Sequence, residues 1–233
     1  MLNGSISSPE FPHYSLLFRE TNNVCVCITL PIVNCLSSGK RENEYRLSRE
    51  CARRALSRID PALSSVIIVN NPDRSPVWPK GYVGSITHTD GYVSAVVALS
   101  SDVRAIGIDS EKIIAAEIIS DIKDHVASKT EQALCIDILQ EQLFYTLLFS
   151  AKESVFKALY PTVKHIFDFT DVRFLGFDAI TGKFRVRLLT DLCEEFQEGT
   201  EIEGGFEING GYVNTSVIML NDKMVPRCIP LKV

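Results

Sequence analysis

The sequence has little of what marks specialised protein classes. Its 233 residues contain no run of about 18 apolar residues, the length that a transmembrane helix needs, and the first residues lack the basic segment and apolar stretch of a secretory signal. Glycine (13) and proline (10) are too few for a collagen-like or low-complexity chain. We therefore expect a globular protein with no stable membrane insertion and no export.

Cysteine gives no sign of a disulfide framework. The seven cysteines are an odd number, and no two of them have the C-x-x-C spacing. The four histidines also lack a ligand-like spacing, so a zinc site is not expected. Reduced thiols and a cytoplasmic location follow as expectations.

Positive charge is scarce overall and concentrated in one segment. The chain carries 24 Lys and Arg against 29 Asp and Glu, and this net charge of −5 excludes a general nucleic-acid binder. Residues 40–58 hold seven bases and three acids, so this segment is +4 and the remainder is −9. One basic segment in an acidic chain indicates a site for a discrete anion.

Hydrophobic periodicity predicts a mixed α/β fold. Apolar residues at helical spacing predict helices over 42–59, 113–126, 131–139 and 143–159, the last one ended by Pro161. Runs rich in β-branched residues and bounded by turns predict strands over 25–33, 66–69, 93–99, 106–108, 184–189, 205–208 and 212–220. The first helix is basic and amphipathic.

An internal repeat indicates that the chain has two related halves. A shift of 120 positions aligns Gly84, Gly91-Tyr92-Val93 and Val97 with Gly204, Gly211-Tyr212-Val213 and Val217. A shift of 103 positions aligns Arg49-Glu50 with Lys152-Glu153 on the helices before these segments. We expect two related α/β (α+β) halves, residues 1–115 and 116–233.

Two carboxylates close the short strand at 106–108. Asp109 and Glu111 are two positions apart, which on an extended chain places both on one face. Mg2+ commonly binds one or two protein carboxylates together with water and phosphate oxygens, so the pair is half of such a site. The alternative is a solvated strand end beside Lys112.

A second charged cluster lies on the helix predicted over 143–159. Lys152 stands between two phenylalanines, where a cation needs an anionic partner, and Glu153 and Lys157 are spaced i,i+4. The alternatives to a functional role are a simple i,i+4 ion pair and a capping box from Ser150 to Glu153.

The basic helix and one Gly-bounded segment are candidate phosphate sites. Arg46, Arg49 and Arg53 share a helix face and suit bidentate binding of an oxyanion, although Arg46, Glu50 and Arg54 also fit an exposed i,i+4 ladder. The segment 84–88, which contains Ser85, Thr87 and His88, offers hydroxyls, backbone N–H groups and an imidazole in a loop. The chain has no G-x-S-x-G motif, which argues against a serine hydrolase.

In this order, the motifs resemble the 4'-phosphopantetheinyl transferase superfamily, in particular its surfactin-type and enterobactin synthase component D-type members. The matching blocks are RENEY (41–45), RECAR (49–53), RSPVWP (74–79), GSITH (84–88), GIDSE (107–111) and FSAKESVFK (149–157). The resemblance implies a pseudo-twofold pair of α/β halves with the active site in the cleft between them. It also implies an enzyme that moves the phosphopantetheine arm of coenzyme A to a serine of an apo carrier protein and releases adenosine 3',5'-bisphosphate.

The resemblance also assigns roles to residues. Arg41 and Arg49 would hold the 3'-phosphate of coenzyme A, helped by Arg53 and Arg74, and Ser85, Thr87 and His88 would contact the phosphates. Asp109, Glu111 and Glu153 would surround Mg2+. Lys152 or Lys157 would stabilise the leaving group, and Glu153 or Glu111 would accept the serine proton.

Partners and competing functions follow from the same resemblance. We expect carrier domains of peptide synthetases, for example in siderophore biosynthesis, as partners of a monomeric enzyme, docked near Phe144 to Phe149 or the loop after Leu139. A non-catalytic coenzyme A or carrier-binding module and a Mg2+-dependent phosphohydrolase are the alternatives.

Overall fold

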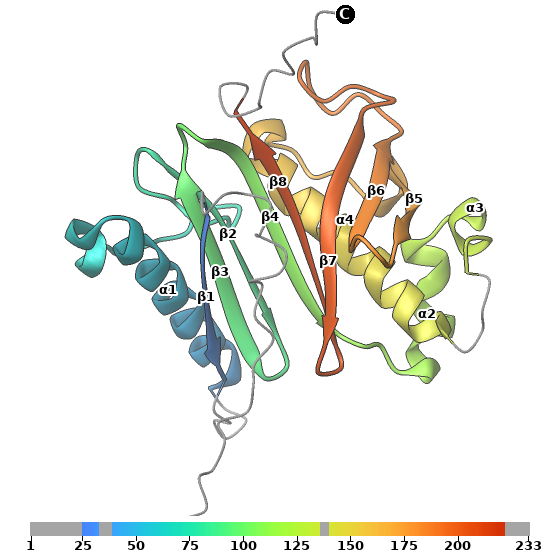
Figure 1. Ribbon diagram of the computed structural model, residues 1–233, viewed down its shortest axis with the longest axis horizontal. Helices are drawn as coiled ribbons and strands as arrows, with labels where there is room; N and C mark the ends of the chain where they lie inside the picture. The colour runs from blue at the N-terminus through green and yellow to red at the C-terminus, as the bar shows by residue number, and fades with distance from the viewer. Residues whose placement is uncertain (1–24, 33–38, 136–139, 222–233) are drawn as a thin grey trace, which may run out of the picture.

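Two antiparallel sheets, each covered on one face by a long helix, form the part of the chain that this computed structural model describes, residues 25–32, 39–135 and 140–221 (Figure 1). The first sheet has the order β1-β3-β2, from β1 (Cys25–Pro31), β2 (Tyr82–Thr89) and β3 (Tyr92–Leu99). The second has the order β4-β8-β7-β6-β5, from β4 (Val103–Lys112), β5 (Val172–Asp178), β6 (Lys183–Leu188), β7 (Glu201–Asn209) and β8 (Tyr212–Leu220). The architecture confirms the predicted α/β class.

Long helices cover the outer faces of both sheets. α1 (Lys40–Ile59) packs on the first sheet, and α4 (Glu141–Val163) lies behind the second sheet in Figure 1. The shorter elements are α2 (Ala116–Val126), α3 (Lys129–Gln132) and the 3-10 turns η2 (Pro61–Ser65) and η4 (Phe169–Asp171). Among the described residues, none of the helices combines the length and apolar character needed to cross a membrane.

The two halves repeat one arrangement of strand, helix and hairpin. β2 and β3 form a hairpin that ends in the pair Thr89 and Tyr92, and β7 and β8 form one that ends in the pair Asn209 and Tyr212. β1 pairs with β3 as β4 pairs with β8, and in each half the long helix follows that strand in the chain. The structure therefore confirms two related halves, and its equivalent hairpins are the segments that the repeat aligns.

The strand that carries Asp109 and Glu111 belongs to the sheet of the second half. The sequence prediction placed these residues in an N-terminal half of residues 1–115, whereas β4 pairs with β8 along its length. A turn over 100–102 separates β3 from β4, so the two sheets divide the chain at that turn. The two carboxylates are thus part of the layer on which α4 packs.

Residues 66–69 do not form the predicted strand. Only an isolated bridge between Asn70 and Pro76 follows them. Val66 and Ile68 instead pack against the core beneath α1, while Ile67 and Val69 face outward. The β-branched run is explained by this one-sided packing rather than by strand pairing.

The predicted helix ends differ from the observed ones. α2 begins at Ala116 rather than at residue 113, and the helix expected over 131–139 is the short α3, which ends at Gln132; residues 136–139 lie outside the described ranges. α4 passes through Pro161 and ends at Val163, and the next residue, Lys164, caps it in a left-handed conformation (φ 61°). Pro161 is tolerated because it lies in the last turn, where its missing N–H removes a single helix bond.

Apolar side chains bind these layers into one body. One cluster joins α4 to the second sheet, and another joins α1 to the first sheet. A third cluster packs Val96 and Ala98 of β3 against Ile106 and Ile108 of β4. The third cluster holds the two halves against each other.

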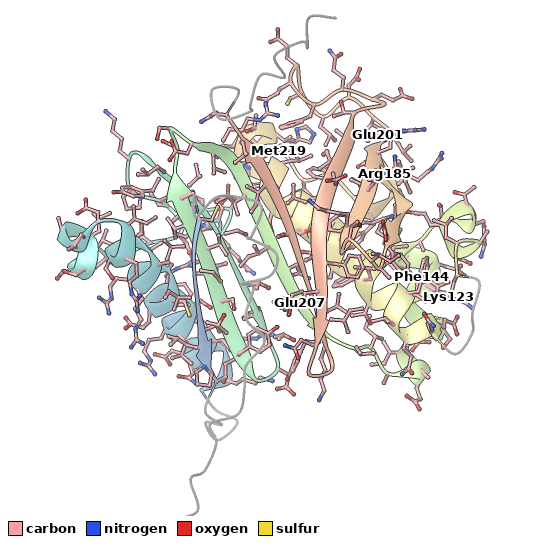
Figure 2. The ribbon with its side chains drawn as sticks, viewed as in Figure 1. Lys123, Phe144, Arg185, Glu201, Glu207 and Met219 are labelled. Carbon is pink, nitrogen blue, oxygen red and sulfur yellow. The ribbon has the colours of Figure 1, made fainter. Side chains whose placement is uncertain are left out.

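Two neighbouring strands of the second sheet, β6 and β7, carry charged pairs on the face away from α4. Arg185 of β6 lies 3.5 Å from Glu201 of β7, nitrogen to oxygen (Figure 2), and Lys183 lies 3.4 Å from Glu203. These side chains alternate along β6 with buried ones that face the helix. This alternation leaves a polar outer surface and an apolar inner one.

Candidate active site

Gly107 allows β4 to lie directly against α4. A Cβ at this position would stand 1.8 Å from the carbonyl oxygen of Ser154 and 2.6 Å from the amide nitrogen of Ala158, which are both backbone atoms of the helix. No side chain fits in that space, so only glycine permits this approach. The contact brings the acidic end of β4 to the middle turns of α4.

Asp109 and Lys157 form an ion pair across this contact. The ammonium nitrogen of Lys157 lies 2.7 Å from Oδ1 of Asp109, whose side chain is 4% exposed. The hydroxyl of Thr87 donates to the same oxygen at 3.3 Å. Asp109 is therefore held by α4 of the second half and by β2 of the first.

Glu111 and Glu153 lie in the electrostatic field of the same pair. Burial, with a further contribution from Asp109, raises the pKa of Glu111 from 4.5 to about 7. Burial also raises the pKa of Glu153, where Lys157 opposes the shift and Asp109 adds to it. Carboxylates gathered in this way with little water favour either a proton or a bound cation.

These three carboxylates suit Mg2+ as partial ligands. In the portion of the chain described, no three His, Cys, Asp or Glu side chains form a ready-made metal site, and Lys157 binds Oδ1 of Asp109. Mg2+ usually takes one or two protein carboxylates and fills its other positions with water and phosphate oxygens. The donor set Asp109, Glu111 and Glu153 therefore offers oxygen atoms of the kind that Mg2+ prefers, without forming a complete metal site by itself.

Ser85 and Thr87 bridge the two sheets. They lie within β2 rather than in the predicted loop and are 4% and 3% exposed. The backbone N–H of Ile108 donates to Oγ of Ser85 at 3.0 Å, and that of Ser110 donates to Oγ1 of Thr87 at 3.1 Å. Both hydroxyls, expected to contact phosphate, are engaged at the seam between β2 and β4, whereas His88 on the same strand is exposed.

Several arginines of α1 line one groove, and they differ in how far other side chains already engage them. Arg46, Arg49 and Arg53 line a groove of about 690 Å3 between α1 and residues 66–69. Arg53 is engaged, because it pairs with Glu50 at 2.7 Å and also donates to the carbonyl of Ser64. Arg49 lies over the Tyr45 ring, 4.8 Å from its centroid, and donates to the side chain of Asn70. Arg49 therefore lies beside the loop that begins at Asn70.

The expected ladder on α1 forms only in part. Arg54 pairs with Glu50 at 2.6 Å, whereas Arg46 donates to Asn43 at 3.1 Å. Glu50 thus forms ion pairs with both Arg53 and Arg54, whereas Arg46 lines the groove without pairing with Glu50.

Arg41 and Arg74 are both exposed, and the loop that carries Arg74 reaches the second half. Arg74 has a left-handed backbone conformation (φ 69°). The neighbouring Asp73 accepts a hydrogen bond from the hydroxyl of Tyr160 on α4 at 2.9 Å. The loop therefore spans from the first half to the helix that carries Glu153 and Lys157.

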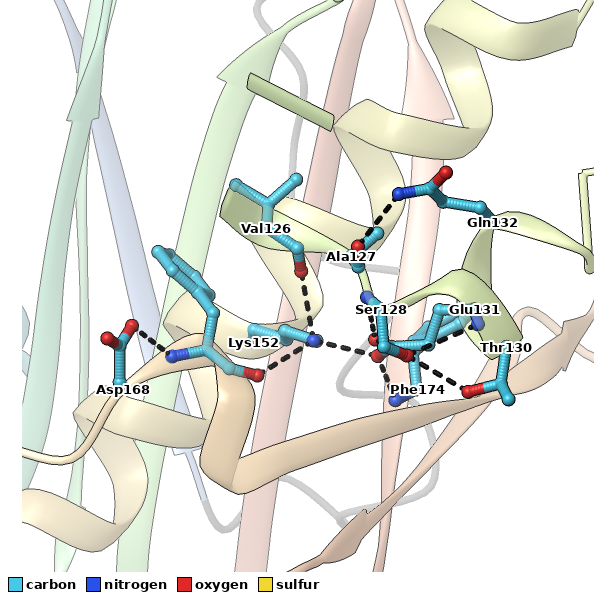
Figure 3. A network of polar contacts seen from close by, with 10 residues as sticks. Val126, Ala127, Ser128, Thr130, Glu131, Gln132, Lys152, Asp168 and Phe174 are labelled. Atoms are coloured by element: carbon cyan, nitrogen blue, oxygen red, sulfur yellow. Dashed lines mark hydrogen bonds and ion pairs between the residues drawn. The ribbon is translucent and has the colours of Figure 1, made fainter. Parts of the chain in front are cut away.

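Lys152 is buried and faces away from the carboxylate cluster. Its ammonium nitrogen lies 2.7 Å from Oε1 of Glu131, and both side chains are 2% exposed (Figure 3). It also donates to the carbonyls of Val126 at 3.0 Å and Phe169 at 2.9 Å. Burial lowers the pKa of Lys152, and Glu131 opposes that shift. The expected role of Lys152 as a phosphate ligand does not match this position.

Ser150 does not cap a helix start. It lies within α4, where its hydroxyl contacts that of Thr215 at 2.9 Å. The capping-box interpretation of residues 150–153 is therefore wrong, because α4 begins at Glu141.

A small aromatic pocket lies beside Glu153. It has a volume of about 200 Å3, and Phe156, Phe167 and Phe169 contribute to its lining. The rings of Phe156 and Phe167 are 5.0 Å apart between centroids. The pocket can take a slender, mostly apolar group next to an acidic side chain.

Glu131 is the polar residue that the sequence analysis missed. The pattern Ser128-x-x-Glu131 is a capping box in the structure, with both of its reciprocal bonds formed. The S-x-x-E spacing was a signal for a helix start at Ser128, and the prediction instead placed Glu131 at the start of a longer helix.

Comparison with known proteins identifies relatives of this chain. A model described as the 4'-phosphopantetheinyl transferase N-terminal domain matches residues 34–98, and one described as the 4'-phosphopantetheinyl transferase superfamily matches residues 105–212. The 4'-phosphopantetheinyl transferase PptT of Mycobacterium tuberculosis is 31% identical over 190 residues, which cover 78% of this chain and 81% of that protein.

Two further relatives match over shorter lengths. The 4'-phosphopantetheinyl transferase Svp of Streptomyces mobaraensis is 35% identical over 64% of this chain and 60% of its own length. Enterobactin synthase component D of Escherichia coli O157:H7 is 35% identical over 51% of this chain and 55% of its own length. The chain thus spans less than two thirds of both of these relatives.

Proposed function

The chain belongs to the 4'-phosphopantetheinyl transferase superfamily, and from this premise we propose that it transfers the 4'-phosphopantetheine arm of coenzyme A to a serine hydroxyl of an apo carrier protein. One observation carries the proposal: the close contact at Gly107 sets Asp109 and Glu111 against the turns of α4 that carry Glu153 and Lys157. This cluster lies where the two halves meet, as Thr87 of β2 bonds to Asp109 of β4.

The reaction is a phosphoryl transfer that needs one proton acceptor. The serine oxygen forms a bond to the phosphorus next to the pantetheine arm, and the bond from that phosphorus to the bridging oxygen breaks. The electron pair leaves with adenosine 3',5'-bisphosphate, and the serine proton passes to a base. Glu153 and Glu111 are the candidate bases because both carboxylates lie in the cluster around Asp109, and in the metal-free protein burial raises the pKa of both carboxyls.

We assign Mg2+ to Asp109, Glu111 and Glu153. When bound, Mg2+ neutralises the charge that develops on the phosphates during transfer. Lys157, 2.7 Å from Asp109 and partly exposed, is placed to add a positive charge on the same side.

The groove of α1 and the aromatic pocket offer places for the two ends of coenzyme A. Arg49, which lines the groove, and the exposed Arg41 on the same helix supply positive charge for the 3'-phosphate at the first half, and His88 of β2 is exposed to solvent. The pocket beside Glu153 combines the rings of Phe156, Phe167 and Phe169 with charged side chains, and we assign the pantetheine arm to it. This placement supports roles for Arg49 and His88 but leaves Arg53 tied to Glu50.

The acceptor, the oligomeric state and the cellular location are proposed from the relatives and from the buried surfaces of the chain. Relatives include enterobactin synthase component D, so we propose carrier domains of peptide synthetases, as in siderophore biosynthesis, as acceptors. The two halves already bury their shared face, which supports a monomer. Burial raises the pKa of Cys25, Cys27 and Cys51 to about 12, which suits unreactive, reduced thiols in the cytoplasm.

Intact-mass spectrometry tests the proposed activity. An apo carrier protein incubated with this enzyme, coenzyme A and Mg2+ should gain the mass of one phosphopantetheine arm. The gain should vanish with EDTA and with the Asp109→Ala variant. Release of phosphopantetheine without a carrier would instead indicate a phosphohydrolase, and coenzyme A binding without transfer to several carriers would indicate a binding module.

A further inference from the structure

Lys152 is adjacent to Glu153 in the chain, but its ammonium group pairs with Glu131 and not with the carboxylates around Asp109. An ammonium group has three N–H donors, and those of Lys152 face three acceptors: Glu131, Val126 and Phe169. Turning the side chain toward a phosphate would leave the Glu131 carboxylate buried at 2% exposure without its counter-charge, which is strongly unfavourable. The geometry therefore favours a fixed position for Lys152.

Glu131 anchors the other end of this pair with both of its oxygens. Oε1 accepts the backbone N–H of Phe174 on β5 at 2.6 Å. Oε2 accepts the backbone N–H and the hydroxyl of Ser128, both at 2.7 Å. One buried ion pair thus joins α4 to the end of α2, the start of α3, β5 and η4 (Figure 3).

Two of the joined segments form the aromatic pocket beside Glu153. On one side, α4 contributes Lys152, Glu153 and Phe156 to the lining. On the other side lie Phe167 and Phe169, and the carbonyl of Phe169 is one of the acceptors of Lys152. The ion pair therefore crosslinks the pocket wall at η4 to the helix that carries the candidate base.

We propose that Lys152 and Glu131 are positioning residues that set the separation between Glu153 and the η4 wall, and so place the pantetheine arm for transfer. The proposal rests on the function proposed above. It assigns Lys152 to catalysis through the packing of the pocket and not through contact with a phosphate. A small displacement of a bound group can slow a reaction strongly, even when the altered residue does not touch the reacting atoms.

Kinetics and binding together test this role. Lys152→Met keeps the length of the side chain and removes its charge, and Lys129→Met, which removes an 81% exposed lysine paired with Asp124, is the matched control. We expect Lys152→Met to lower kcat with coenzyme A about 10- to 100-fold. The affinity for adenosine 3',5'-bisphosphate, which lacks the arm, should stay within about twofold of wild type by calorimetry. Lys129→Met should change neither quantity.

A double variant separates positioning from phosphate binding. In Lys152→Met alone, Glu131 keeps a buried and unpaired charge, so adding Glu131→Gln should recover part of the lost kcat. A phosphate ligand predicts a different result: at least a tenfold loss of affinity for adenosine 3',5'-bisphosphate and no recovery in the double variant. That result would overturn the proposal. Glu131→Gln alone serves as the test if Lys152→Met does not fold, because its kcat should fall with nucleotide affinity unchanged.

Wild-type transfer in the same assay keeps the two proposals apart. Absence of transfer by the wild-type enzyme overturns the proposed function. Transfer by the wild type with an unchanged kcat in folded Lys152→Met overturns the positioning role and leaves the function standing.

Discussion

Tyr92 and Tyr212 pack edge to face across the boundary between the two halves, with ring centroids 5.1 Å apart and planes at 73°. The repeat aligns these residues with each other, so the contact joins equivalent positions. The hydroxyl of Tyr92 donates to Oδ1 of Asn214 at 2.6 Å, and that of Tyr212 donates to the carbonyl of Asp90 at 2.7 Å. These paired contacts fix the relative orientation of the halves near the carboxylates of β4.

Replacing Gly107 with alanine should disable the enzyme. The new Cβ would meet backbone atoms of Ser154 and Ala158, so β4 and α4 must separate. We expect stability to fall by about 1–3 kcal/mol and activity to fall by roughly 100-fold, since the carboxylates move with β4. Denaturant unfolding and the mass assay measure the two effects. Gly39→Ala, where the added Cβ meets nothing within 4 Å, is the control and should behave as wild type.

Glu153→Gln should remove turnover and leave coenzyme A binding largely intact. The amide keeps the shape of the side chain but cannot accept the serine proton, so we expect a loss of at least about 100-fold in kcat. Calorimetry with coenzyme A reports the binding. The exposed Glu198→Gln serves as the control. A near-normal rate in Glu153→Gln would exclude Glu153 as the base and move that role to Glu111.

Comparison of Thr87→Val with Ser85→Ala should distinguish two roles of these hydroxyls. Both accept a backbone N–H of β4, and only Thr87 also donates a hydrogen bond to Asp109. Each change removes a hydroxyl that accepts a backbone N–H of β4, so each should cost about 1–3 kcal/mol of stability. Only Thr87 also donates to Asp109. Activity should therefore fall further in Thr87→Val, by about tenfold for one lost bond to a charged group. Equal activities in the two variants would argue against a role for Thr87 in orienting Asp109.

Arg49→Ala should weaken binding of coenzyme A more than that of its analogue without the 3'-phosphate. Loss of one charge-assisted bond corresponds to about a tenfold rise in KM for coenzyme A. Dephospho-coenzyme A should show little change, because it lacks the group that we assign to Arg49. Arg53→Ala is the matched variant on the same helix face, and its engagement with Glu50 and Ser64 predicts a smaller effect. Equal losses for both nucleotides would contradict the assignment.

The stability of the metal-free protein should fall as the pH rises through about 7. The pKa of Glu111 is raised from 4.5 to about 7 by burial and by Asp109, so the folded protein holds a proton that the unfolded chain releases. This contribution is complete below the unfolded pKa and is lost as the pH passes the folded one. Thermal unfolding in EDTA between about pH 5 and about pH 8 should show a steeper decline for the wild type than for Glu111→Gln. Parallel curves would contradict the raised pKa.

Magnesium should reverse part of that decline. Protons and Mg2+ compete for the same carboxylates, so the rise in Tm on adding Mg2+ should be larger at high pH than at low pH. Asp109→Ala should reduce the rise at every pH. An equal effect of Mg2+ on wild type and Asp109→Ala would place the ion elsewhere.

Local pattern predicted α1, α4 and the hairpin of β7 and β8, because their signals lie within a few neighbouring residues, but it missed β2 and overextended α3. The spacing on α1 matches the burial of Cys51, Ala52, Ala55 and Leu56. The partner of β4 could not be inferred in this way, since pairing with β8 joins residues about a hundred positions apart, as Glu111 and Val213 illustrate.

The interpretation of charged residues depended on partners that the sequence does not reveal. Lys152 required an anion, but nothing in its own helix indicated that Glu131, 21 positions earlier, would supply it. Ser85 and Thr87 have the composition of a phosphate site and instead accept bonds from β4. In both cases tertiary contacts, rather than residue type, decided the role.

β1 and β4 occupy equivalent places in the two halves but carry different kinds of side chain at corresponding positions. Leu30 of β1 pairs with Val93 of β3, and Glu111 of β4 pairs with Val213 of β8. The repeat aligns Val93 with Val213, so Leu30 and Glu111 stand at corresponding points.

The same comparison relates Ile28 of β1 to Asp109 of β4. The strand end that carries two carboxylates in one half thus corresponds to an apolar strand in the other. A symmetric dimer of one such unit would carry carboxylates on both copies, because identical subunits share every residue. Two copies within a single chain are free of that constraint, and here the candidate carboxylates lie on β4 of the second half, whereas the basic helix α1 lies in the first half.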